Sequence, residues 1–328
     1  MKTTSKLRQL SVVAGALLLA IGVSACGNND DSGDGGGSTP SGDALKIVMI
    51  SHSPQGSAYW TTVHNGAKAA AKDLNVDLTY EMSGGDNQKQ IQLINSAVSE
   101  KPDAIVTSLS DPTAFTKPIG DAEAAGVPVF SMNSGTSVYK ETGSLGHAGE
   151  DESVAGQGVG DKFNELGSKH ILCVFQEQGN IGLDNYCNGI KSTFAGDYDS
   201  IYVPADSDPA GSLASVKAKL ASDPSIDAVY SLALDLAPLI AKDVKASGSD
   251  VTVASWGFSG DTLTAIEDGS MAFAEDQQPF LQGYQSVEMA VLYARWGFQP
   301  GAAFLTGPNF ITADKVDQLR ELSKEGIR

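Results

Sequence analysis

The chain has 328 residues, with 40 acidic against 22 basic side chains and a formal net charge of −18 at pH 7. A surface of that sign repels phosphate backbones, which argues against nucleic acid as a partner. Residues 44–328 are numerous enough to form two domains, each with its own hydrophobic core.

The first 25 residues have the organisation of an export signal. A basic start at residues 2–8 precedes an apolar run at 10–23, which ends in the sequence VSAC at Cys26. The run is too short to span a bilayer comfortably, because a spanning helix needs about 20 apolar residues. The small residues before Cys26 resemble a bacterial lipoprotein signal, so we expect residues 1–25 to be removed and Cys26 to be acylated. A plain signal peptide that happens to precede Cys26 is the alternative.

The segment at 26–43 is expected to be a flexible tether. After Cys26 it reads GNNDDSGDGGGSTPSGD, in which no side chain is large and apolar enough to be buried. A tether of this kind holds a folded body away from a surface. No later stretch of the sequence is apolar enough to cross a membrane.

Two cysteines remain after Cys26, at Cys173 and Cys187. Neither belongs to a CxxC pair or a Cys/His cluster, so we expect no zinc site. Outside the cytosol two such thiols usually form a disulfide. Two buried free thiols are the alternative.

From residue 44 onwards, short β-branched runs alternate with longer helical stretches. The first series predicts strands at 45–50, 78–82, 104–109 and 127–132, with helices at 58–74, 87–99 and 113–125. The second series predicts helices at 152–166, 184–194, 210–221 and 236–246, with strands at 170–175, 201–204, 228–232 and 251–255. Residues 271–328 are expected to complete both sheets with short strands and two helices. Two successive series of βα units predict an α/β fold with two similar doubly wound parallel-sheet lobes.

Polar and aromatic residues gather where the predicted strands end. Ligands of open parallel sheets bind outside the carboxyl ends of the strands. Small polar residues there are also typical of solvated loops. The large aromatic side chains of Tyr59, Trp60, Tyr186 and Trp256 are unfavourable at loop tips unless something covers them, which favours a binding site.

The sequence contains no motif for catalysis or for a cofactor. There is no P-loop and no GxGxxG after the first strand, and GFSG at 257–260 is one residue short of a nucleophile elbow. The four histidines do not have metal-ligand spacing. Carboxylates such as Asp184 and Asp235 more often cap helices or accept sugar hydroxyls. We therefore expect a protein that is not an enzyme and that uses no cofactor or metal.

Six stretches in order resemble the periplasmic sugar-binding proteins of ABC transporters, of the ribose-binding type. They read IVMISHSPQGSAYW, KPDAIVTSLSDPTAF, AGVPVFSMNSG, GHAGEDESVAGQGVGD, CVFQEQGNIGLDNYCNGIKSTF and VTVASWGFSGDTLTAIEDGSMAFAEDQQPFLQGY. The resemblance covers residues 44–328 and implies the type I periplasmic binding protein fold, with two lobes joined by a three-strand hinge. It implies an N-terminal lobe at 44–147 plus 278–306 and a C-terminal lobe at 148–277 plus 307–328.

The resemblance also implies site residues, with departures from the family pattern. Tyr59 and Trp60 match an aromatic pair that stacks on a sugar ring, and Gln277 matches a glutamine beside the hinge. Asn133 and Ser134 stand where ribose binders have an Asp-Arg pair. Tyr186 replaces a usual Arg, and Gly257 replaces an Asp beside the aromatic Trp256. The loss of two Arg forks puts ribose itself in doubt. The expected site comprises Ser51, Tyr59, Trp60, Asn133, Asp184, Tyr186, Asp235, Trp256 and Gln277.

The function implied by the resemblance is capture of a monosaccharide or polyol and its delivery to the permease and ATPase subunits of an ABC transporter. The protein is then a monomer outside the cytoplasm, anchored to the cell membrane by the lipid on Cys26. In a subgroup of the family the cysteines at 173 and 187 recur, which implies their disulfide. A sensor that presents its ligand to a chemoreceptor or a histidine kinase is the alternative.

Overall fold

The computed structural model describes residues 43–328. The expected signal at 1–25, Cys26 and the tether up to residue 42 lie outside the described residues. Among the helices of the described part, none is both long and apolar enough to cross a bilayer.

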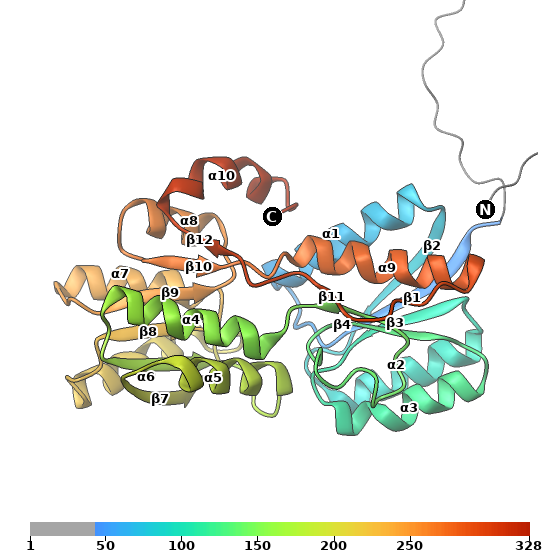
Figure 1. Ribbon diagram of the computed structural model, residues 1–328, viewed down its shortest axis with the longest axis horizontal. Coiled ribbons are helices and arrows are strands. Elements are labelled where there is room, and N and C mark those ends of the chain that lie inside the picture. The colour runs from blue at the N-terminus through green and yellow to red at the C-terminus, as the bar shows by residue number, and fades with distance from the viewer. Residues whose placement is uncertain (1–42) are drawn as a thin grey trace, which may run out of the picture. The chain divides into compact units, whose positions relative to one another are not determined.

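The first sheet has six strands in the order β11-β5-β4-β3-β1-β2 (Figure 1). All its neighbouring strands pair in parallel. The strands are β1 (Leu45–Ser51), β2 (Val76–Met82), β3 (Ala104–Ser108), β4 (Val129–Asn133), β5 (His147–Gly149) and β11 (Phe304–Leu305). Its helices are α1 (Ala58–Asp73), α2 (Asn87–Glu100), α3 (Pro112–Ala124) and α9 (Pro279–Trp296). We call this sheet and its helices the first lobe.

The second sheet also has six strands, in the order β12-β10-β9-β8-β6-β7, and only β12 runs antiparallel to its neighbour. Its strands are β6 (His170–Phe175), β7 (Asp197–Tyr202), β8 (Ala228–Ser231), β9 (Thr252–Trp256), β10 (Phe273–Glu275) and β12 (Phe310–Ile311). Its helices are α4 (Glu152–Leu166), α5 (Ile181–Thr193), α6 (Pro209–Ser222), α7 (Ala237–Ser247), α8 (Gly260–Glu267) and α10 (Val316–Lys324), preceded by the 3-10 turn η1 (Ala313–Lys315). We call this unit the second lobe.

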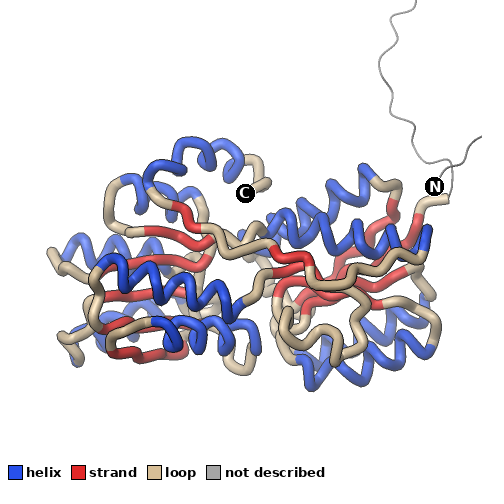
Figure 2. The backbone as a smooth tube through the Cα atoms, viewed as in Figure 1, coloured by secondary structure: helices blue, strands red, loops and turns tan. Residues whose placement is uncertain are grey.

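The α/β fold with two parallel-sheet lobes is thus confirmed, and the chain crosses between the lobes three times. The crossings follow β5, β10 and β11, because each of these strands is succeeded by an element of the other lobe. In both lobes helices cover the two faces of the sheet (Figure 2). The exact lobe boundaries given by the resemblance stay a prediction.

Each lobe has its own hydrophobic core on both faces of its sheet. The central strands β3 and β4 are buried at every position, as their near-continuous apolar sequences predict. Acidic side chains cap the helices that follow: Asp111, for example, accepts the backbone N–H of Ala114 at 3.1 Å and begins α3.

One helix pair in each lobe packs through glycine. A Cβ on Gly283 of α9 would lie 1.9 Å from the carbonyl oxygen of Val63 in α1, and one on Gly156 of α4 would lie 2.2 Å from that of Tyr186 in α5. The helices approach backbone to backbone, which only glycine allows. This packing fixes α1 and α5, the helices that flank the candidate site.

The main differences from the sequence prediction lie in short elements. The strand β5 and the helix α8 are not among the predicted elements, and β7 begins at Asp197 instead of residue 201. The three residues of β5 read HAG and form a strand because they pair with β4. The sequence DYDSIY of β7 is largely polar because β7 lies at the edge of its sheet.

Candidate ligand-binding site

A cavity lies between the two lobes, beyond the carboxyl ends of strands from both sheets. This is the position at which open parallel sheets bind ligands. From the first lobe it is lined by His52, Pro54, Ser57, Tyr59, Trp60 and Asn133. From the second lobe it is lined by Gln176, Glu177, Asn180, Leu183, Asp206, Leu232, Leu234, Asp235 and Trp256.

Aromatic rings from both lobes meet at the cavity. Tyr59 at the start of α1 stacks on Trp256 at the end of β9, with ring centroids 6.0 Å apart and planes 19° apart. Trp60 stands edge-on to Tyr59 at 5.4 Å and to His52 at 4.9 Å. The helix that carries Tyr59 and Trp60 begins at the cavity because the side chain of Ser57 caps it.

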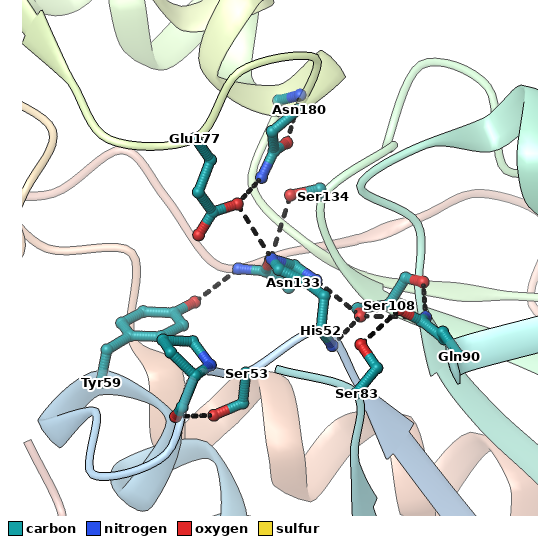
Figure 3. Close-up of polar contacts among 12 residues, drawn as sticks. His52, Ser53, Tyr59, Ser83, Gln90, Ser108, Asn133, Ser134, Glu177 and Asn180 are labelled. Atoms are coloured by element: carbon teal, nitrogen blue, oxygen red, sulfur yellow. Dashed lines mark hydrogen bonds and ion pairs between the residues drawn. The ribbon is translucent and has the colours of Figure 1, made fainter. Parts of the chain in front are cut away.

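Amides hold the hydroxyl of Tyr59 in place. Asn133 donates to this hydroxyl from Nδ2 at 2.8 Å (Figure 3). The hydroxyl lies 2.8 Å from the Oε1 atoms of both Gln277 and Gln282, and it donates its single hydrogen to one of them at a time. Burial raises the pKa of Tyr59 far above its ordinary value, so the phenol stays protonated. Among the described residues, the Nε2 of Gln277 is buried without an acceptor.

His52 links the lobes on the other side of the cavity (Figure 3). Its backbone N–H donates to Ser108 Oγ at 3.0 Å, and its Nδ1 lies 2.7 Å from the same oxygen. This hydroxyl can either donate to Nδ1 or accept from it, so the tautomer of the ring sets the direction of the hydrogen bond. The Nε2 of His52 faces Glu177 Oε2 of the second lobe at 3.5 Å. Burial lowers the pKa of His52, against the opposing charge of Glu177, so the ring is neutral at pH 7.

Two buried carboxyl groups lie where the chain crosses between the lobes. Glu150 follows β5 and Glu275 ends β10, and the two side chains lie close enough for the charge of Glu150 to raise the pKa of Glu275. Burial raises the pKa of both, so the pair holds a proton at neutral pH. A Cβ on Gly307 at the third crossing would lie 2.7 Å from Glu150 Oε2. Trp256 donates from Nε1 to Glu150 Oε1 at 3.1 Å, which connects the crossings to the cavity.

The structure brings five of the predicted site residues together at the cavity: Tyr59, Trp60, Asn133, Asp235 and Trp256. Gln277 lies behind Tyr59 and lines a neighbouring cavity.

Three predicted site residues do not line this cavity. Ser51 is buried within β1, where its Oγ lies 2.9 Å from the hydroxyl of Tyr80. Tyr186 is buried in α5, where it accepts a hydrogen bond from the hydroxyl of Tyr230 at 3.1 Å. Asp184 is exposed on the same helix. The physical reason is the direction in which the faces of α5 (Ile181–Thr193) point: Leu183 lines the cavity, whereas Tyr186 packs on Tyr230 in the core.

Five polar residues at the cavity were missed by the sequence prediction: His52, Gln176, Glu177, Asn180 and Asp206. All five lie in the few residues after β1, β6 or β7. The position of these strand ends was the available signal. The predicted site followed instead the pattern of the ribose binders, whose arginines are absent from this sequence.

Comparison with known proteins identifies the family. Residues 47–297 match the model of the periplasmic binding protein domain, and the chain belongs to that family. A carbohydrate transporter from Acidothermus cellulolyticus, solved in complex with myo-inositol, is 38% identical with a TM-score of 0.83, and the match covers 87% of this chain and all of the other.

Two further relatives are more distant. The periplasmic sugar-binding protein of an ABC sugar transporter from Legionella pneumophila is 29% identical with a TM-score of 0.74, over 80% of this chain and 99% of the other. The xylose/arabinose-binding protein of Sulfolobus acidocaldarius is 25% identical over 277 residues, which are 78% of this chain and 68% of that protein.

The buried carboxyls predict a stability that depends on pH. The pKa of Glu150 is raised in the folded protein, and burial raises that of the neighbouring Glu152 from the ordinary 4.5 to about 7. A raised pKa contributes stability that is present below pH 4.5 and is lost as the pH rises through the folded value. The side chain in Glu150→Gln is neutral at every pH, whereas the parent loses stability as the pH rises. The difference in free energy of unfolding between variant and parent, measured by urea denaturation, should therefore increase in favour of the variant between pH 5 and pH 8. We expect a gain of roughly 1.4 kcal/mol per unit of pKa shift.

The matched control for removal of a carboxylate is Glu100→Gln at the exposed end of α2. A Glu150→Gln variant that loses as much stability as the parent over this pH range would show that Glu150 is not held protonated.

Proposed function

We propose that the protein captures a monosaccharide or polyol between its two lobes and delivers it to the permease of an ABC transporter. The observation that carries this proposal is the cavity at the strand ends, where aromatic rings of both lobes stand beside fixed polar groups. A sugar ring has apolar C–H faces and hydroxyl edges, so a site for it needs aromatic surfaces and polar groups together. The relative from Acidothermus cellulolyticus, solved with myo-inositol, supports this ligand class.

The proposed contacts come from both lobes. Trp60 and Trp256 offer ring faces, while Asn133 of the first lobe and Asn180 and Asp235 of the second offer polar atoms. A ligand that touches both lobes stabilises the arrangement in which they face each other, which is how ligand binding selects one state of a hinged protein.

A catalytic role does not follow from the His52 chain of hydrogen bonds. Ser108, His52 and Glu177 are the residue types of a nucleophile triad. However, Ser108 is fully buried in β3 and its hydroxyl accepts the backbone N–H of His52, so it is not presented to a ligand. We infer that the protein is a binding protein and not an enzyme. The relatives are described as binding or transporter proteins, which gives no support to the sensor alternative.

We further propose that the mature protein is an extracytoplasmic monomer held to the cell membrane by a lipid on Cys26. The support is the sequence: an apolar signal core ends in VSAC, and the polar segment at 27–43 follows. Permease and ATPase subunits are the proposed protein partners.

We also propose that Cys173 and Cys187 form a disulfide in the exported protein. Both are free thiols in the structure, but they lie on adjacent elements, β6 and α5, and interact with each other. Their hydrogen bond lowers the pKa of Cys187, which favours the thiolate needed for oxidation.

The cavity predicts both a ligand and a residue on which binding depends. Calorimetry with myo-inositol, xylose, arabinose, ribose, glucose and fructose should find at least one that binds. Trp256→Ala should weaken that binding by about 2–4 kcal/mol, because it removes a ring that contacts the ligand. The control Trp296→Ala removes a tryptophan that is 60% exposed at the end of α9 and is not among the residues that line the cavity. This variant should bind the ligand as tightly as the parent. Equal binding by the parent and Trp256→Ala would place the ligand elsewhere.

The anchor predicts where the protein is found in a cell. Cys26→Ser removes the only proposed site of acylation, so the variant should move from the membrane fraction to the soluble extracytoplasmic fraction while it keeps its ligand affinity. Fractionation followed by immunoblotting measures this, and a variant that still pellets with membranes would contradict the proposed lipid anchor.

The disulfide predicts a thiol count. Unfolded, unreduced Cys26→Ser protein should release no titratable thiol, whereas the same protein with Cys187→Ser added should release one. Reduction should lower the free energy of unfolding by roughly 3 kcal/mol, because a loop of this size is no longer closed in the unfolded chain. Two thiols in the unreduced Cys26→Ser protein would rule the bond out.

A further inference from the structure

The charge of the cavity is one-sided. Glu177 follows β6, Asp206 follows β7 and Asp235 follows β8, and these three strands are neighbours in the order β8-β6-β7. Their carboxyl ends therefore place three carboxylates of the second lobe along one wall of the cavity. Burial raises the pKa of Asp206, and the charges of Glu177 and Asp235 raise it further, which shows that the three groups are close enough to repel one another.

No positive side chain in the lining balances this charge. None of the described residues that line the cavity is a lysine or an arginine. The one group that could become a cation is His52, which burial keeps neutral at pH 7. Glu177 accepts a hydrogen bond from the uncharged amide of Asn180 at 2.6 Å. Arg328, in the neighbouring cavity, forms an ion pair with Asp276.

The aromatic rings of the cavity, which come from both lobes, also favour a positive ligand. Trp60 and Trp256 line the cavity together with Tyr59, and the face of an indole ring attracts a cation. The net charge of −18 adds a long-range attraction of the same sign. Carboxylates together with aromatic rings, without a lysine or an arginine in the lining, are suited to a ligand with hydroxyl and ammonium donors, and they repel an anionic one.

We propose that the site selects its polyol by charge and that its preferred ligand is an amino sugar or aminocyclitol, which carries a protonated amine at neutral pH. This inference rests on the proposed binding of a monosaccharide or polyol. It adds an order of affinity: the amine binds most tightly, the neutral parent compound less tightly, and the corresponding uronate or phosphate least.

The test compares matched ligands that differ in one substituent. Calorimetry at pH 7 and low salt measures glucose, glucosamine and glucuronate as one set, and myo-inositol, amino-deoxy-inositol and inositol phosphate as another. In at least one set the amine should bind about tenfold more tightly than the neutral compound, because an ion pair in a partly desolvated site contributes on the order of 1–2 kcal/mol. The ratio should shrink in 0.5 M salt, which screens charges.

Matched variants locate the effect. Asp206→Asn should reduce the ratio of amine to neutral affinity severalfold. Asp250→Asn removes the same charge from an exposed position of the second lobe outside this cavity lining and should leave the ratio unchanged.

The possible outcomes separate this inference from the function on which it rests. Neutral polyols that bind as tightly as their amines, or a ratio that Asp206→Asn leaves unchanged, overturn the charge selection and leave polyol binding intact. A failure of every neutral and amino compound in both sets to bind overturns polyol binding as well. Tight binding of a uronate or a phosphate contradicts the inference directly.

Discussion

The pair of buried carboxyls at the lobe crossings is the constraint on which the rest of the site depends. The two glutamates lie where burial disfavours charge, and burial raises the pKa of both. All three crossings meet at this pair, since Glu150, Glu275 and the backbone at Gly307 belong to different crossings. The carboxyl of Glu150 also accepts the hydrogen bond from the indole of Trp256. The position of the Trp256 ring is therefore set by a residue of the crossings as well as by the strand β9 that carries it.

The first lobe supports the cavity by a different means. Its wall depends on neutral hydrogen bonds: amides fix the phenol of Tyr59, and the hydroxyl of Ser108 holds the ring of His52 in place. Neutral groups have little effect on the charge of the cavity, whereas the second lobe contributes its carboxylates. The two lobes thus differ in charge: both contribute aromatic rings to the cavity, whereas its carboxylates come from the second lobe alone.

The sequence was sufficient for the architecture, because the evidence for it is repeated along the chain. Apolar strands and amphipathic helices alternate over both lobes, and a small error at one element, such as the start of β7, leaves the order of the others intact. The prediction of the candidate site is more sensitive to such errors, because each site residue must point in a particular direction. Both the predicted and the observed helix contain Tyr186, but the face of α5 that points to the cavity carries Leu183, and Tyr186 points into the core.

The residues that were harder to predict are those whose role depends on the partner lobe. Glu150 follows a strand of three residues with no apolar pattern, and its importance comes from Glu275, which lies more than a hundred residues later in the chain. Neither glutamate belongs to a motif. Their proximity follows from the packing of the crossings, which periodicity along one segment does not encode.

The three crossings also determine how the protein can be made. The helix α9 packs on α1 through Gly283, and β11 completes the edge of the first sheet beside β5. The first lobe therefore lacks an outer helix and an edge strand until residues 279–305 have been synthesised. Dissecting the chain at residue 150 would therefore leave the first lobe without α9 and β11, and would place these two elements in the fragment that contains the second lobe. Assembly of the two lobes is thus a property of the whole chain, and the last fifty residues decide when either lobe is complete.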